Sequence, residues 1–194
     1  MRSMLAGVSA LILMGSASAN AAVSLVGTDV TISYLFPTAT QVFGTTILPI
    51  TTDPTTLDCS ASGSGVCSAF VENAAITIGA DSFTVVEDSG SSYATEPFNG
   101  FQFSNLDFGP GEKITGFSLL TNLPGLTPAD VSFTGDSIMY NASGRSFENS
   151  PYFVTLTVTT AVPELSTSAM MIFGLAGLGF LAYRTSRKGA VFAA

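Results

Sequence analysis

The stretch from Asn20 to Val162 offers few side chains that can catalyse a reaction. The chain has no His and no Trp, so the commonest general base is absent. The base beside a nucleophilic serine would have to be Lys113, and no Ser-x-x-Lys or Gly-x-Ser-x-Gly pattern accompanies it. A glycosidase needs only two carboxylates about 5–9 Å apart. The 13 acidic residues of this stretch allow such a pair but single none out.

A metal site is the other chemistry that acidic residues allow. Asp81 stands just before an expected strand, and Glu87 and Asp88 follow it. Calcium binds several oxygen atoms from loop carboxylates and carbonyls, so these three residues are calcium candidates if they converge. The Asp-x-Asx-x-Asx-Gly spacing of an EF-hand does not occur, and acidic turn residues are commonly only solvated. We therefore expect no cofactor, with calcium at these residues as the alternative.

Charge excludes one class of partner. The same stretch has 13 acidic residues against Lys113 and Arg145, a net charge of −11. Such a charge repels phosphate backbones and anionic lipid surfaces. We expect no binding of nucleic acid.

The sequence predicts that these side chains are carried by short β-strands. Along residues 23–160 apolar residues alternate with polar ones more often than they recur at helical spacing. In the run 152–159, Val154, Leu156 and Val158 are expected to face a core while the threonines between them face water. Short strands separated by Gly- and Pro-containing turns are typical of an all-β fold, an antiparallel sandwich of jelly-roll or Ig-like type. The other expected strands are 30–34, 76–78, 82–86, 101–103, 116–120, 131–133 and 137–140.

The stretch from Asn20 to Val162 holds 12 of the 15 Phe residues, so phenylalanine is expected to be a main component of its hydrophobic core. We expect Phe98, Phe101 and Phe103 to pack in the core; the alternative is an aromatic platform for a ligand. A domain of 143 residues can bury about two thirds of its surface and be stable alone.

Residues 1–19 have the pattern of a secretory signal peptide. Arg2 supplies a positive n-region, residues 4–14 are apolar, and Ala17-Ser18-Ala19 provides small residues before a cleavage site. Ala19-Asn20-Ala21 is an alternative site two residues further on. A first transmembrane helix is less favoured, because the apolar run is about half of the roughly 20 residues that a span needs.

An exported protein folds in an oxidising environment, which determines the expected state of its two cysteines. Cys59 and Cys67 bracket a small Ser- and Gly-rich loop. An exported protein with two cysteines is expected to join them in a disulfide. A redox role would need the tighter Cys-x-x-Cys spacing, so we expect a structural bond.

A second apolar segment covers residues 166–183, which are 18 residues without a charge. As a helix it would be roughly 27 Å long, close to the thickness of the hydrocarbon core. Arg184, Arg187 and Lys188 follow it and would stay cytoplasmic under the positive-inside rule. The alternative is a buried core helix, which needs protein on every side. We expect a transmembrane helix with the main domain outside.

Directly before this segment stands Val162-Pro163-Glu164-Leu165-Ser166-Thr167. With the Gly-containing apolar segment and the basic end, it resembles the PEP-CTERM sorting signal of exopolysaccharide-producing Gram-negative bacteria, whose usual motif is V-P-E-P-S-T. Leu165 replaces the second proline of that motif. The residues that match it are Val162, Pro163, Glu164, Ser166 and Thr167.

The resemblance implies a partner and a route. An exosortase would cleave near Pro163-Glu164 and release the domain from the inner membrane to the cell envelope, the surface or the extracellular matrix. The expected organisation is therefore a signal peptide at 1–19, an exported sandwich at 20–162 and a sorting tail at 163–194. The tail comprises the motif 162–167, the transmembrane helix 166–183 and the cytoplasmic end 184–194.

Two classes of function fit this organisation. The first, which we expect, is a non-catalytic surface or matrix protein, with exopolysaccharide or a biofilm as its surroundings. The second is a secreted carbohydrate-active enzyme that uses paired carboxylates. Two acids facing each other across a cleft would favour the enzyme, and acids scattered on turns would favour the non-catalytic protein.

Overall fold

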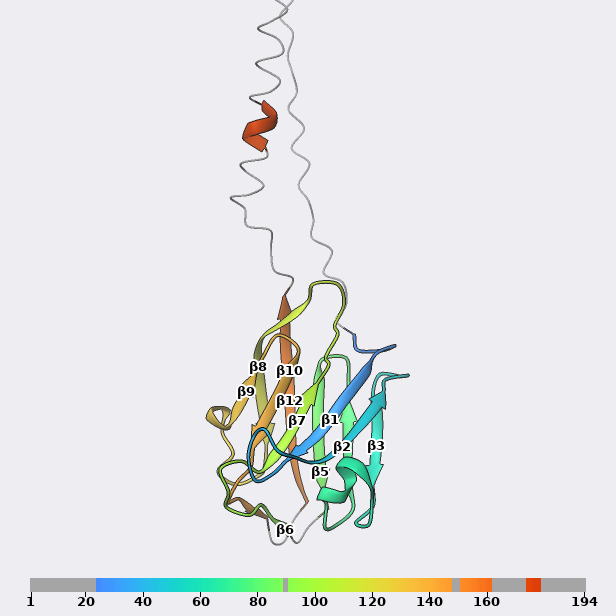
Figure 1. Cartoon of the computed structure of the whole chain (residues 1–194), viewed down its shortest axis with the longest axis vertical. Coiled ribbons are helices and arrows are strands. Elements are labelled where there is room, and N and C mark those ends of the chain that lie inside the picture. The colour runs from blue at the N-terminus through green and yellow to red at the C-terminus, as the bar shows by residue number, and fades with distance from the viewer. Residues whose placement is uncertain (1–23, 89–90, 148–150, 162–173, 179–194) are drawn as a thin grey trace, which may run out of the picture.

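The computed structural model describes residues 24–88, 91–147, 151–161 and 174–178. Two five-stranded antiparallel sheets face each other and form a β-sandwich, which confirms the expected all-β fold (Figure 1). The strand order is β2-β1-β7-β10-β9 in the first sheet and β3-β4-β5-β12-β8 in the second. A third, two-stranded sheet pairs β11 with β6.

The first sheet consists of β1 (Asp29–Leu35), β2 (Val42–Pro49), β7 (Gly100–Ser104), β9 (Val131–Phe133) and β10 (Ser137–Asn141). The second consists of β3 (Thr55–Cys59), β4 (Ala74–Ile78), β5 (Ser82–Glu87), β8 (Lys113–Thr121) and β12 (Tyr152–Ala161). The remaining elements are β6 (Ser91–Ser92), β11 (Ser146–Phe147) and two 3₁₀ turns, η1 (Gly65–Ala69) and η2 (Pro128–Asp130).

All the strands expected from the sequence are present, most of them one to three residues longer at an end. Four further strands, β2, β3, β6 and β11, were not expected. In β2 the exposed and half-buried positions alternate without a fully buried one, so its sequence lacks the apolar alternation that indicates a strand.

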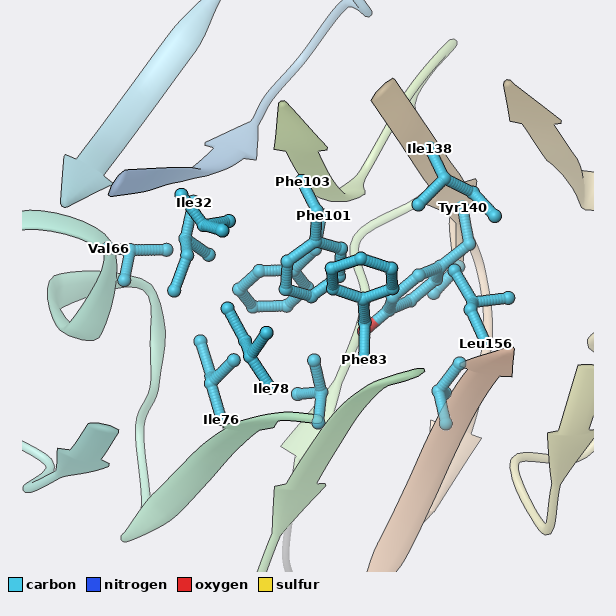
Figure 2. Close-up of a cluster of buried hydrophobic side chains, with 14 of the residues drawn as sticks. Ile32, Val66, Ile76, Ile78, Phe83, Phe101, Phe103, Ile138, Tyr140 and Leu156 are labelled. Carbon is cyan, nitrogen blue, oxygen red and sulfur yellow. The ribbon is translucent and has the colours of Figure 1, made fainter. Parts of the chain in front are cut away.

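One continuous core lies between the sheets (Figure 2). Val154, Leu156 and Val158 of β12 are buried as expected, because alternate residues of a strand face one side of the sheet. The expectation that phenylalanines fill the core is confirmed by Phe101 and Phe103, which are 1% and 0% exposed. Phe98 is also buried.

The sandwich has two distinct ends (Figure 1). At one of them β1 begins, β12 finishes and the loop 105–112 connects the two sheets; we call it the loop end. At the opposite end lie η1 and β6. We call that one the tyrosine end, for the residues described below.

The expected signal peptide and sorting motif lie outside the described residues, as do Arg184, Arg187 and Lys188. Within the expected transmembrane segment, residues 174–178 are described and helical. No helix in the described ranges is long and apolar enough to cross a membrane.

Candidate functional site

The three residues expected to converge on calcium lie apart. Asp81 precedes β5 and Glu87 is the last residue of that strand, so roughly 20 Å of extended chain separates them. Glu87 is buried, whereas Asp88 is exposed. The condition under which these residues were calcium candidates is therefore not met, because the two ends of strand β5 lie at opposite ends of the sandwich. No three metal-binding side chains are grouped within the part of the chain that the structure describes.

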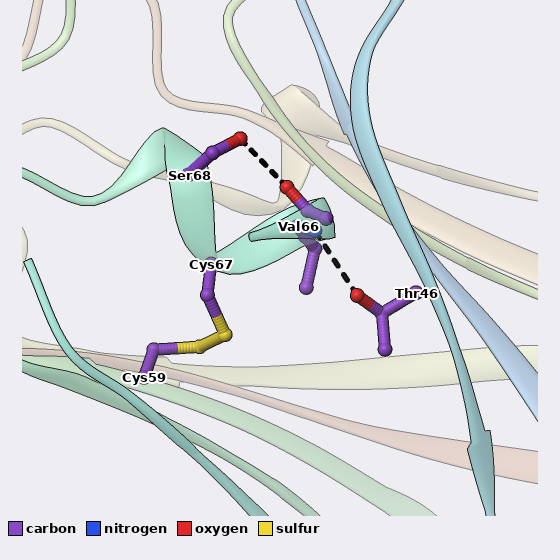
Figure 3. The surroundings of a disulfide bond; sticks show 6 residues. Thr46, Cys59, Val66, Cys67 and Ser68 are labelled. Carbon is purple, nitrogen blue, oxygen red and sulfur yellow. Dashed lines mark hydrogen bonds between the residues drawn. A yellow bond between two sulfur atoms is a disulfide. The ribbon is translucent and has the colours of Figure 1, made fainter. Parts of the chain in front are cut away.

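The expected disulfide between Cys59 and Cys67 is present and joins the end of β3 to η1 (Figure 3). The η1 turn also bonds to the edge strand β2, where the Val66 N–H donates to Thr46 Oγ1 at 3.1 Å. A side chain at Gly44 could not be accommodated there, since its Cβ would lie 2.3 Å from the Gly65 carbonyl oxygen. The disulfide therefore fastens η1 across the open side between the edge strands of the two sheets.

Behind η1 lies a cavity of about 80 Å³, which we call the tyrosine cavity. Of the eight described residues that line it, four carry aromatic rings and one, Glu87, carries a carboxylate. Val71, which is 61% exposed, and the exposed Ser92 also line it, so the cavity reaches the surface. The lining residues are Tyr34, Ala69, Phe70, Val71, Glu87, Ser92, Tyr93 and Phe101.

Strand register brings these residues together from distant parts of the sequence. In the first sheet, Tyr34 pairs with Phe101, and Phe101 pairs with Tyr140 on its other side. In the second sheet, Glu87 pairs with Tyr152. The two rows occupy the same end of the sandwich and point inward, because Glu87 continues the buried alternation of Phe83 and Val85. With Tyr93, which follows β6, the four tyrosines form a cluster around Glu87.

Hydrogen bonds link the cluster. The Tyr152 hydroxyl donates to Glu87 Oε2 at 3.2 Å and also bonds to the Tyr93 hydroxyl. The Tyr34 hydroxyl donates to Asn99 Oδ1, and Asn99 Nδ2 donates to the Ala94 carbonyl at 3.0 Å. These bonds satisfy polar groups that would otherwise be costly to bury.

Burial keeps the tyrosine hydroxyls protonated. It raises the pKa of Tyr34 to about 12, with the charge of Glu87 as the second cause. Burial, followed by the neighbouring tyrosines and Glu87, raises the pKa of Tyr93, Tyr140 and Tyr152 well above the usual 10. The Tyr140 hydroxyl is buried without a hydrogen-bond partner among the described residues, although Tyr93 lies near enough to influence its pKa.

The protonated hydroxyls of the cluster can donate hydrogen bonds but cannot readily take up protons. A phenol with so high a pKa does not act as a base or nucleophile near neutral pH. Among the described residues that line the tyrosine cavity, Glu87 is the one carboxylate, so these residues do not supply the pair of acids that a glycosidase needs.

A second hollow, of about 390 Å³, lies at the loop end. The described residues of its wall include Asp107, Glu112 and Asp136 but no aromatic ring on which a sugar could stack. Asp107 Oδ1 accepts a bond from the Gly109 N–H at 3.0 Å, and Asp136 Oδ1 accepts one from Thr134 Oγ1 at 2.9 Å. Asp107 and Asp136 therefore each accept a hydrogen bond within their own turn.

The two basic residues of the domain, Lys113 and Arg145, lie in different surroundings. Lys113 begins β8 at the loop end and is exposed. Arg145 forms an ion pair with Asp130, with 2.7 Å between Nη2 and Oδ2, and also donates to the Gly125 carbonyl at 2.9 Å. The hydrogen bonds from Thr127 and the charge of Arg145 outweigh burial and lower the pKa of Asp130.

Comparison of the chain with protein families, with curated proteins and with solved structures finds no match. The tyrosine cluster is not apparent in the sequence, because its members are up to 118 residues apart, from Tyr34 to Tyr152. A signal for Glu87 was nevertheless present in the alternation Phe83, Val85, Glu87.

Proposed function

We propose that the chain is a non-catalytic exported protein of the cell surface or extracellular matrix, delivered through a PEP-CTERM-like tail. An exosortase-type enzyme would process the tail at Pro163-Glu164. Before processing, the helix 166–183 would anchor the protein in the inner membrane, and afterwards the domain would reside in the envelope or in a matrix that contains exopolysaccharide.

One observation carries this proposal: the order of the motif, the apolar segment and the basic cluster along the sequence from Val162 to Lys188. Pro163 lacks a backbone N–H and has a fixed φ, so a helix is not expected to extend smoothly through it. Pro163 also biases Val162 toward an extended conformation. A processing enzyme would therefore meet an extended peptide next to the membrane.

Features of the folded domain are compatible with this function. The last strand, β12, ends at Ala161, one residue before Val162. The disulfide suits an oxidising compartment. Asp107 and Asp136 at the loop end accept hydrogen bonds within their own turns, and Glu87 is the one carboxylate among the described residues that line the tyrosine cavity. These contacts give no support to the alternative of a secreted carbohydrate-active enzyme.

The test replaces Pro163 and Glu164 by Ala and follows the protein by cell fractionation with an antibody to the β-sandwich. We expect this variant to stay in the inner membrane at its longer, unprocessed size. Leu165→Pro restores the usual motif and serves as the matched control, with processing unchanged or faster. Normal release of the double variant would show that the tail is only an anchor and would overturn the exosortase proposal.

A further inference from the structure

The tyrosine cavity combines aromatic rings with a carboxylate. The rings of Tyr34, Phe70, Tyr93 and Phe101 line it together with Glu87. The face of an aromatic ring carries partial negative charge and attracts cations, and a carboxylate adds a full negative charge. We propose that the tyrosine cavity is a binding site for a small alkylammonium group.

The size of the cavity limits its occupant. Pockets for drug-sized ligands have volumes of about 300–1,000 Å³, whereas this cavity has a volume of about 80 Å³. It is therefore too small for a sugar ring, and a headgroup of a few heavy atoms, such as methylammonium, fits it better. Because exposed Val71 and Ser92 line the cavity, a longer substituent on the ammonium group can lie outside.

Charge selects a cation over other small polar molecules. An anion would lie beside Glu87 in a domain with 13 acidic and two basic residues. A neutral molecule such as methanol would gain neither the ion pair nor the cation–π attraction. The tyrosine hydroxyls stay protonated, so they can act as hydrogen-bond donors to Glu87.

The experiment titrates the purified protein with methylammonium chloride and follows the aromatic proton signals by NMR. Methanol and acetate are the matched neutral and anionic probes. We expect saturable binding of methylammonium in the millimolar range, since a ligand of so few atoms binds weakly, and at least tenfold weaker binding of the two other probes. No saturation up to the limit of solubility, or equal binding of methanol, would overturn the proposal.

Variants localise the binding. Glu87→Gln removes the charge with little change of shape and is expected to weaken methylammonium binding at least tenfold. Asp88→Asn, at the exposed neighbouring residue, is the control and should bind within twofold of the wild type. Ser92→Phe covers the mouth of the cavity from an exposed position and should also weaken binding at least tenfold. If Glu87→Gln does not fold, Ser92→Phe provides the test. Methylammonium binding that is unchanged in Ser92→Phe contradicts the proposal.

Two larger probes distinguish the sources of the ammonium group. Glucosamine, compared with N-acetylglucosamine, represents an amino sugar, and butylammonium represents an aliphatic amine. Selective competition with methylammonium by either amine supports the site and identifies its source, whereas competition by N-acetylglucosamine as strong as by glucosamine overturns it. The proposal concerns the folded domain and does not depend on the sorting tail.

Discussion

The two ends of the sandwich are built from the ends of the same strands, yet polar groups are buried at one end and exposed at the other. At the tyrosine end, Glu87 and the cluster hydroxyls are largely buried, and the Tyr152 hydroxyl bonds to both Glu87 and the Tyr93 hydroxyl. At the loop end, Asp107 and Asp136 are exposed and bond to their own turns.

The cause of this difference is the cover over the strand ends. At the tyrosine end, η1 and β6 close over the two inward-facing rows, and the disulfide holds η1 in place. Once water is excluded, a polar group there is costly to bury unless it finds a protein partner. Of the four tyrosine hydroxyls, that of Tyr140 alone lacks one among the described residues. A covered end can therefore hold a carboxylate in a defined position, while an open end leaves its acids solvated.

Loss of an aromatic ring from the covered end should lower the stability of the protein more than any other change considered below. The ring of Phe101 lies 5.0 Å from that of Tyr34, 5.3 Å from that of Phe70 and 5.9 Å from that of Tyr140, measured between centroids. Phe101→Ala should lower the free energy of unfolding by about 3–5 kcal/mol, because the cavity left behind cannot collapse fully. Unfolding in urea measures this loss.

The control for Phe101→Ala lies nearer the loop end. Phe133 is 39% exposed, and its ring contacts that of Phe117 at 5.7 Å. Phe133→Ala should cost only about 1 kcal/mol, since less apolar surface is lost from the interior. Similar losses for the two variants would contradict the contrast between the ends.

Removal of the disulfide tests whether η1 needs a covalent bond to stay in place. Replacing both Cys59 and Cys67 by Ser should lower the free energy of unfolding by about 2.5 kcal/mol on the loop-entropy model, because the open chain gains freedom when unfolded. Reductant should lower the stability of the wild type by a similar amount and leave the double variant unchanged. A double variant as stable as the oxidised wild type would show that η1 needs no covalent fastening.

These contrasts also explain which parts of the structure the sequence predicts. β12 is buried on one face from Tyr152 to Val158, so the alternation of its residues is visible in the sequence. The edge strand β2 is covered only in part, by η1, and its threonines give no clear alternation. The consecutive residues Asn99-Gly100 indicate a turn. In the structure Asn99 is buried and Gly100 begins β7, because the segment before them folds over the tyrosine end.

The candidate site was less predictable than the fold. An acid at the end of a strand indicates a solvated turn, which is correct for Asp136 and wrong for Glu87. The difference lies in the covering segments η1 and β6, whose positions follow from the disulfide and from strand register. Spacing along the sequence does not contain that information.

Alkaline pH should act on the covered end with a smaller effect. Unfolded tyrosines ionise near pH 10, whereas the native pKa of Tyr34 is about 12 and those of Tyr93, Tyr140 and Tyr152 are also raised. Their contribution to stability is complete below pH 10 and is lost as the pH rises from 10 through the native values. Absorbance at 295 nm should show these tyrosines ionising together with unfolding.

Tyr34→Phe separates one member of the cluster from the others. Near neutral pH this variant should be about 1 kcal/mol less stable, because the hydrogen bond to Asn99 is lost. Between pH 10 and about 12 its stability should fall less steeply than that of the wild type. Ionisation of all four cluster tyrosines near pH 10 in a protein that keeps its native circular dichroism would contradict their burial.

The smallest effect is expected at the open end. In Asp107→Asn and Asp136→Asn the amide oxygen can still accept the bonds from the Gly109 N–H and the Thr134 hydroxyl. Both side chains are exposed, so water already screens their charge and its removal should change the free energy of unfolding by less than about 0.5 kcal/mol. Urea unfolding near neutral pH, compared with Tyr34→Phe, measures the difference. A loss as large as that of Tyr34→Phe would mean that the loop end also depends on specific polar contacts, and cover alone would no longer explain how the two ends differ.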